Sequence, residues 1–451
     1  MNKNSIEEAK SRSGHFVTTA FFLAVSIFFS MKVYAQNHPP PDTVAGIPVN
    51  YNEAKVGKYV LPNPLTLDNG QKVTDAQTWY EKRRPQILNL YKQFQYGYTP
   101  GPPKYMKFDV FDKGTKAFNG TAIRRQVTIY FSKNKNGPQI NLLIYVPTDA
   151  KKPVPVLLNP SFFPNYSRVD DPGVKRGKMW NRHHERVPAP KLTKFGKLNV
   201  PLFINHGFGI ATFYYDDVEP DFNGGRKYGV EDLYLKPGQQ KPDANQWGAI
   251  SAWAWGLSRA LDYLDTDKQV DSKRVALFGI SRLGKTVLWA GARDQRFAMV
   301  IASCSGEGGA ALSRRDFGET IAHLTAPSRY PYQFCHNYGM FAHFVDELPV
   351  DGNMLLSLIA PRPVLLQTGN KDLWSDPKGE FLAAVAAGKV YRLLGKQGLG
   401  TDKWPPAGKP ILHTIGYYMH NGGHGTVPSD WNIFIKFMQK YLVTQKDSGQ
   451  Q

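Results

Sequence analysis

Residues 274–285 read RVALFGISRLGK and contain the serine best placed to act as a nucleophile. A short apolar run breaks at Gly-Ile-Ser-Arg and then turns helical, an arrangement that exposes a serine hydroxyl at the edge of a sheet. The spacing, G-x-S-x-x-G, is one residue longer than the common form of this motif. Gly279 allows a sharp backbone bend and Gly284 allows the following helix to pack close to the strand. We therefore predict that Ser281 is the nucleophile of an acyl-transfer reaction.

A base and an acid follow further along the chain. The apolar run PVLLQT leads to Asp372, and the run ILHTIGYY leads to His420 and His424. His424 lies among glycines that let its loop fold toward Ser281, so we predict that it is the base, whereas His420 is interpreted as structural. Asp372 is the predicted partner of the His424 Nδ1 proton. Asp376 is the alternative acid, and its other interpretation is a helix N-cap.

Two cations accompany the serine. Arg282 follows it directly, where the oxyanion site normally uses only a backbone N–H. A guanidinium there can stabilise the charge that develops on a tetrahedral intermediate, although a surface ion pair is the other interpretation. Lys285 lies one helical turn beyond Ser281 and can face the same cleft, or it can be an ordinary solvated lysine.

Apolar runs alternate with helical patterns along the rest of the chain. Residues 123–132 and 140–147 alternate apolar and polar positions, which predicts paired antiparallel strands. More uniformly apolar runs predict buried strands at 154–159, 209–215, 274–280, 297–303, 363–368 and 411–418. Helices are predicted over 74–96, with a bend or boundary at Pro85, and over 245–265 and 430–442, with long insertions at 160–200 and 306–360. The pattern indicates an α/β-hydrolase fold, a three-layer sandwich around a mostly parallel sheet with loop insertions.

The chain has 451 residues and begins with features of an exported protein. The apolar run 16–29 and the small-residue pattern near Ala35 predict a signal peptide over 1–35, too short for a membrane span. An extended arm is expected over 36–75 and a catalytic domain over 76–445. The formal charge of +19 falls to +17 without residues 1–35, which contain four Lys/Arg and two Glu. An acidic polysaccharide is the expected partner, because no nucleic-acid-binding motif is present.

No metal or other cofactor is expected. The pair His183-His184 and the acidic run 216–221 lack ligand spacing and are interpreted as loop packing and strand-end capping. The chain has two cysteines, Cys304 and Cys335, which could form a disulfide or stay as buried thiols.

Several stretches resemble the glucuronoyl esterases of carbohydrate esterase family 15. The most specific is GISRLGK at 279–285. The others are SGEGG at 305–309, SRR at 313–315, FGET at 317–320, DLWSDP at 372–377 and the helix WGAISAWAWGLSRALDYL. The likeness spans roughly residues 79–441. It implies a carboxylic ester hydrolase that cleaves the ester between a (4-O-methyl-)glucuronoyl branch of glucuronoxylan and a lignin alcohol.

The resemblance also assigns roles to individual residues. By it, Ser281 is the nucleophile, Arg282 acts at the oxyanion site, Lys285 contacts the sugar hydroxyls, Glu319 and Trp374 bind the sugar, and His424 is the base.

One position departs from the family pattern. Many members carry the triad acid immediately before the Ser-Gly-x-Gly-Gly stretch, where this chain has Cys304. A thiol with a pKa of about 8.5 cannot replace a carboxylate at neutral pH. The other placement known in the family falls on Asp372, and Glu307 is interpreted as structural. Two alternatives stay open: an acetyl xylan or cinnamoyl esterase, and a catalytically weakened carbohydrate-binding homologue. We expect a monomer.

Overall fold

The structure, a computed structural model, describes residues 41–192 and 196–443. The predicted signal peptide, the first residues of the predicted arm and the last two residues of the predicted catalytic domain lie outside this part of the chain. The described residues from Thr43 onward form one compact unit. Among the described residues, no helix is long and apolar enough to cross a membrane.

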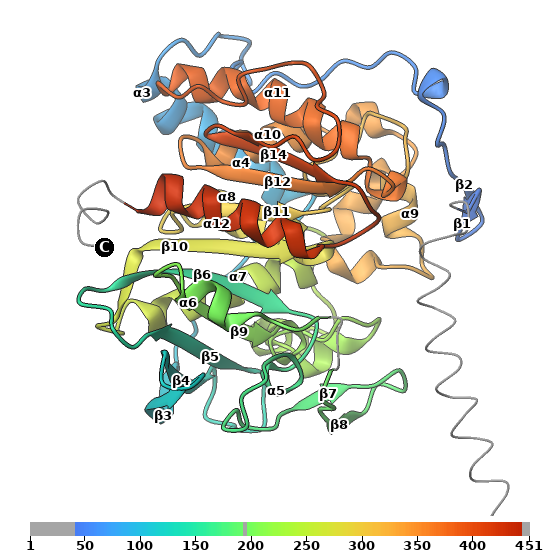
Figure 1. Cartoon of the computed structure of the whole chain (residues 1–451). Coiled ribbons are helices and arrows are strands. Elements are labelled where there is room, and N and C mark those ends of the chain that lie inside the picture. Colours follow the sequence, from blue (N-terminus) through green and yellow to red (C-terminus); the bar gives the residue numbers. More distant parts are fainter. Residues whose placement is uncertain (1–40, 193–195, 444–451) are drawn as a thin grey trace, which may run out of the picture. The chain divides into compact units, whose positions relative to one another are not determined.

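A ten-stranded sheet forms the centre of this unit (Figure 1), with the strand order β13-β14-β12-β11-β10-β6-β9-β5-β4-β3. The strands are β3 (Lys107–Ala117), β4 (Ala122–Tyr130), β5 (Gln139–Pro147), β6 (Val154–Ser161), β9 (Gly209–Tyr214), β10 (Val270–Ile280), β11 (Met299–Ser303), β12 (Val364–Gly369), β13 (Ile411–Leu412) and β14 (Ile415–His420). The six strands from β14 to β9 are parallel, and antiparallel strands extend both edges. The sheet is therefore mostly parallel, as predicted.

Helices cover both faces of the sheet. One face packs against α4 (Arg84–Phe94), α7 (Ala249–Leu264), α8 (Arg282–Arg293), α10 (Gly352–Ile359) and α11 (Pro377–Leu393). The other face packs against α6 (Val200–Ile204) and α12 (Pro428–Leu442), and α12 crosses in front of the sheet in Figure 1. Successive residues of β10 point to opposite faces, since Leu277 joins the first core and Phe278 the second. These three layers confirm the predicted α/β-hydrolase architecture.

Most predicted elements are present, with several differences. The strand predicted over 411–418 is two strands, because the chain reverses after Leu412 and β13 pairs antiparallel with β14. The edge strand β3 was not predicted, and of the helix α11 the sequence indicated only a possible N-cap at Asp376. The helix predicted over 74–96 begins as α3 (Ala76–Thr78), passes through a wide turn over Trp79–Arg83 and continues as α4, with Pro85 in the first turn of α4.

Both predicted insertions carry short elements. The first contains α5 (Asn165–Arg168) and a small hairpin of β7 (Lys178–Trp180) and β8 (Arg186–Pro188). The second contains α9 (Ile321–Thr325) and α10.

The described part of the arm packs on the domain. It holds the short pair β1 (Thr43–Val44) and β2 (Ile47–Pro48). The Gly318 N–H donates to the Asn50 carbonyl at 2.8 Å, and Lys378 contacts the Glu53 carboxylate at 2.8 Å.

Candidate active site

Ser281 occupies a strained turn between β10 and α8. Its φ of +59° and ψ of −128° are unusual for a residue other than glycine and place the hydroxyl on a sharp strand-to-helix turn. Position 279 requires glycine because the backbone of Leu283 lies close to it, and a Cβ there would lie 2.1 Å from the Leu283 carbonyl oxygen. Gly284 lets α8 approach β11, where a Cβ would lie 2.8 Å from the Ser303 carbonyl oxygen. The motif thus forms the tight turn that a nucleophilic serine needs.

The strands that carry the predicted residues end at one edge of the sheet. Ile280 of β10 is level with Ser303 of β11, and Ser303 is level with Gln367 of β12. Gly369 of β12 is level with His420 of β14. Because these strands are parallel and in register, the residues that follow them gather at the same edge.

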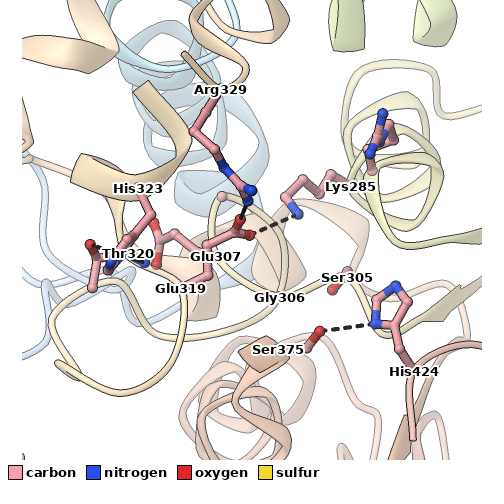
Figure 2. Close-up of polar contacts among 12 residues, drawn as sticks. Lys285, Ser305, Gly306, Glu307, Glu319, Thr320, His323, Arg329, Ser375 and His424 are labelled. Atoms are coloured by element: carbon pink, nitrogen blue, oxygen red, sulfur yellow. Dashed lines mark hydrogen bonds and ion pairs between the residues drawn. The ribbon is translucent and has the colours of Figure 1, made fainter. Parts of the chain in front are cut away.

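Asp372 and His424 contact each other at this edge. Nδ1 of His424 donates to the Asp372 carboxylate at 2.7 Å. The Ser375 hydroxyl lies 3.3 Å from the same nitrogen, a contact that Figure 2 shows. Asp372 is buried, whereas the imidazole side chain is 43 % exposed. Burial alone would raise the pKa of Asp372, but His424, Ser375 and Cys304 together hold this pKa below its ordinary value. The carboxylate therefore stays ionised and fixes the imidazole with Nε2 free to accept a proton.

The serine hydroxyl is not yet bonded to the imidazole. Among the described residues, the Ser281 hydroxyl has no hydrogen-bond partner, and the His424 imidazole forms hydrogen bonds only with Asp372 and Ser375. Catalytic hydrogen bonds of this kind are often long in the ligand-free state and tighten when substrate binds.

Cys304 lies beside the acid and the base. Its sulfur, an Asp372 oxygen and a His424 nitrogen all lie within 4.8 Å of one another. Among the described residues this is the one group of three side chains that could ligate a metal ion. Burial raises the pKa of the Cys304 thiol far above its ordinary value, so the sulfur stays protonated. Cys304 and Cys335 are both buried free thiols.

The alternative acid and the alternative base have other partners. Asp376 caps α11 by accepting from the Gly379 N–H at 2.9 Å, and it pairs with Arg315 at 2.9 Å. His420 is buried and contacts Asp430 at 2.9 Å. These contacts favour Asp372 and His424 as the reactive pair.

Glu307 also has a structural environment. Its buried carboxylate accepts hydrogen bonds from Ser313 and Tyr338, both at 2.7 Å.

Arg282 is held by a carboxylate that the sequence did not point to. Asp221 pairs with the Arg282 guanidinium and also accepts hydrogen bonds from Tyr332 at 2.9 Å, Gln333 at 2.7 Å and Tyr215 at 2.6 Å. Burial would lower the pKa of Arg282, but Asp221 raises it above its ordinary value. The arginine is thus a fixed cation directly after the serine. Asp221 belongs to the acidic run interpreted as strand-end capping, and nothing in that run's spacing marks this partnership.

Lys285 and Glu319 are neighbours in the structure. The buried Lys285 ammonium lies 3.8 Å from the Glu319 carboxylate, and Arg329 contacts the same carboxylate at 3.3 Å (Figure 2). The Glu319 N–H donates to the Trp374 carbonyl at 2.8 Å. The Arg329 guanidinium lies 5.6 Å from the centre of the Trp374 ring. Arg329 was not predicted, since a single arginine in a loop has no distinguishing spacing.

The glycine-rich stretch 305–309 is anchored by Glu380 of α11. This buried carboxylate accepts hydrogen bonds from the Gly306 N–H at 2.7 Å and from the Ser305 hydroxyl at 3.0 Å. Burial raises the pKa of Glu380 to about 8, although both hydrogen bonds lower it. Glu380 thus fixes the loop that follows Cys304, and sequence analysis did not single it out.

Known proteins are similar to this chain in sequence and in fold. A family model described as "Glucuronyl esterase, fungi" matches residues 178–395. "Carbohydrate esterase MZ0003", from an unknown prokaryotic organism, is 43 % identical over 416 residues, which cover 90 % of this chain and 95 % of that protein. A solved glucuronoyl esterase from Solibacter usitatus is 43 % identical with a TM-score of 0.82, covering 87 % of this chain and all of that chain.

A carbohydrate esterase family 15 glucuronoyl esterase from Teredinibacter turnerae T7901 is also similar. It is 34 % identical with a TM-score of 0.75, and the match covers 87 % of this chain and 92 % of that one. The family resemblance drawn from the motifs is therefore confirmed, and this chain belongs to the glucuronoyl esterases of carbohydrate esterase family 15.

Proposed function

We propose that this protein is a serine esterase that hydrolyses the ester between a glucuronoyl group and an alcohol. The observation that carries the proposal is the Asp372–His424 pair, 2.7 Å apart, at the sheet edge where Ser281 occupies its strained turn. Family membership supports the substrate class, because the relatives from Solibacter usitatus and Teredinibacter turnerae are named glucuronoyl esterases.

In the first half of the reaction, Ser281 attacks the uronoyl carbonyl carbon. His424 accepts the hydroxyl proton at Nε2, and Asp372 stabilises the resulting imidazolium through Nδ1. Negative charge moves to the carbonyl oxygen, where the fixed Arg282 guanidinium and backbone N–H groups stabilise it. The tetrahedral intermediate then collapses, the alcohol leaves with the proton from His424, and the glucuronoyl group stays esterified to Ser281.

In the second half, water repeats the same steps. His424 takes a proton from the water as it attacks the acyl group, and when the second tetrahedral intermediate collapses, His424 returns that proton to the departing Ser281 oxygen. The products are the free glucuronate and the unmodified enzyme. All proton transfers use one imidazole, so no cofactor is needed for the sequence of steps.

Lys285, Glu319 and Trp374 are proposed to hold the sugar. A buried ammonium and a buried carboxylate that lie 3.8 Å apart can donate to and accept from neighbouring sugar hydroxyls. Trp374 offers an aromatic face next to this pair, and Arg329 braces both Glu319 and the ring.

We further propose that the alcohol portion is a lignin alcohol and that the substrate is a glucuronoxylan ester. Export fits this polymeric substrate, and the apolar run 16–29 supports a signal peptide over 1–35. We also propose that residues 76–445 act as a monomeric catalytic domain, with 36–75 as an arm on its surface.

The test compares hydrolysis of benzyl glucuronate by the wild type, Ser281→Ala and Ser272→Ala. Ser272 is the matched control, since it lies at the opposite end of β10. We expect Ser281→Ala to lose at least about 10³-fold in kcat, and Ser272→Ala to retain wild-type rates. If the wild type hydrolysed acetylated xylan or methyl ferulate but not benzyl glucuronate, the proposed function would be wrong. The protein would then be an acetyl xylan or cinnamoyl esterase. No turnover of any ester would favour a carbohydrate-binding homologue.

A further inference from the structure

A cavity of about 860 Å³ lies next to the end of β9 and is called the β9 cavity below. Its wall includes Tyr214, the last residue of β9, and Gln139, the first residue of the antiparallel partner β5. The hairpin β7–β8 closes one side, because Arg186 pairs with Asp217 and the backbone N–H of Trp180 donates to the Tyr214 hydroxyl. One end of the cavity therefore lies at the same sheet edge as the catalytic residues.

The β9 cavity is separate from the predicted sugar-binding residues. In the strand order, β6 and β9 follow β10, and β5 follows β9. Neighbouring strands lie about 4.8 Å apart, so β9 and β5 lie roughly 10 and 15 Å from the strand that carries Ser281. A single sugar ester bound at Ser281 cannot fill both places, whereas a longer saccharide chain can.

Positive charge dominates the wall of this cavity. Six basic residues line it: Lys135, Lys175, Arg176, Lys178, Arg186 and Lys227. Only Arg186 forms an ion pair with another residue in the described part of the chain, and its partner is Asp217. The other five cations form no ion pair with any carboxylate of the described residues.

The acidic residues of the wall offset little of this charge. Asp217 forms an ion pair with Arg186 and accepts a hydrogen bond from the Asn141 amide. Burial raises the pKa of Asp216 to about 8, so this carboxyl is mostly neutral at pH 7. Asp232 is exposed and faces Arg226 at 3.8 Å. The cavity consequently presents an excess of positive charge to an incoming ligand.

Aromatic and unpaired polar groups complete the wall. Trp180 packs edge-on against Phe222 and tilted against Tyr228, which is 46 % exposed. Three covered polar atoms of the wall have no hydrogen-bond partner among the described residues: Trp180 Nε1, Gln139 Oε1 and Asn165 Oδ1. Such atoms are normally paired, and small side-chain rotations would offer them to a ligand rich in hydroxyl groups.

We propose that the β9 cavity is a second carbohydrate subsite, which binds a free uronate branch of the polysaccharide whose esterified branch lies at Ser281. The inference rests on the proposed function. An ester carbonyl carries no charge, so the reacting group does not account for the basic character of the chain. A free carboxylate on the same polymer would account for the basic surface, because the unpaired lysines attract a negative charge. The aromatic wall can pack against the sugar ring that carries this carboxylate.

The experiment measures binding of glucuronoxylan oligosaccharides with free glucuronate branches by isothermal titration calorimetry. The matched ligand has the same chain with each carboxylate reduced to a primary alcohol. The test variant combines Lys175→Gln, Lys178→Gln and Lys227→Gln, all exposed. The control variant combines Lys268→Gln, Lys273→Gln and Lys436→Gln. These lysines are exposed, do not line the cavity and form no ion pair within the part of the chain that the structure describes.

We expect the dissociation constant of the charged oligosaccharide to be about tenfold higher for the test variant than for the wild type. Binding of the reduced oligosaccharide should not change, and the control variant should match the wild type. Equal losses in both variants, or equal wild-type affinity for the charged and reduced ligands, would overturn the proposal. Tighter binding of DNA than of the oligosaccharide would overturn it as well, in favour of a general polyanion surface.

Turnover separates this inference from the proposed function. The test variant should hydrolyse benzyl glucuronate with the wild-type kcat and KM, since that small ester does not reach the β9 cavity. Its KM for a polymeric glucuronoxylan ester should rise about tenfold. An unchanged KM for the polymer would count against the subsite while leaving the esterase function intact.

Discussion

Replacement of Asp372 by asparagine tests the link on which the proposed mechanism depends. The change keeps the shape of the side chain but removes the charge that faces His424 at 2.7 Å. Two unit charges about 4 Å apart interact by about 4 kcal/mol at an effective dielectric constant of 20. The asparagine variant lacks this stabilisation of the imidazolium in the transition state. Because about 1.4 kcal/mol corresponds to a factor of ten in rate, kcat falls roughly 10³-fold. The wrong imidazole tautomer adds to this, so we expect a loss of about 10³- to 10⁴-fold.

The assay is the initial rate on benzyl glucuronate, with thermal unfolding as the check that the variant is folded. Asp376→Asn serves as the comparison, since that carboxylate caps α11 and pairs with Arg315. It should lower stability and leave kcat within a few-fold of the wild type. If Asp372→Asn kept kcat within tenfold, or if Asp376→Asn were the slower enzyme, the assignment of the acid would be wrong.

A rescue variant makes the same test sharper. Cys304 has a φ of +45°, a conformation that aspartate tolerates better than most residues, and its sulfur lies within 4.8 Å of the His424 nitrogen. The double variant Asp372→Asn, Cys304→Asp should therefore have a kcat at least tenfold higher than that of Asp372→Asn alone. Cys304→Ala in the same background should restore none.

Three further outcomes follow from the contacts at the site. Asp221→Asn releases the Arg282 guanidinium, so kcat on benzyl glucuronate should fall about 10- to 100-fold with a smaller change in KM. Lys285→Ala should lower the ratio of kcat/KM for benzyl glucuronate to that for 4-nitrophenyl acetate about tenfold, because only the sugar ester uses the ammonium group. Glu380 is neutral in the fold below about pH 8 but ionised in the unfolded chain above its ordinary pKa of 4.5, so wild-type stability should fall as pH rises from 5 to 8. In the Glu380→Gln variant, the free energy of unfolding should fall by up to about 4 kcal/mol less between pH 5 and pH 8 than in the wild type. Urea unfolding at both pH values measures this difference.

The parts of the fold that could be predicted are those with a local signal. Buried parallel strands appear as uniformly apolar runs, and the elbow appears as two glycines around a serine. The edge strand β3 had no such signal. Its sequence, KFDVFDKGTKA, is rich in charged residues, and most of its side chains are exposed, as is common for strands that protect a sheet edge.

The site divides in the same way. Ser281, Asp372 and His424 could be chosen because each follows an apolar run, and their order along the chain is that of one known fold. Asp221 and Glu380 act through partners 61 and 74 residues away, at Arg282 and Gly306. No spacing in the sequence encodes such contacts, which depend on how the insertions and α11 pack over the sheet.

Cys304 illustrates how one site can accept its acid from either of two strands. It follows β11 and Asp372 follows β12, and these strands are adjacent, parallel and in register. Both side chains lie close to the His424 imidazole, so a carboxylate at either position can pair with it, but two carboxylates so close together would raise each other's pKa and share a proton. With Asp372 present, position 304 is best filled by a group that stays uncharged. A buried thiol with a raised pKa meets that requirement, so the cysteine is compatible with an active triad and is no sign of a lost one.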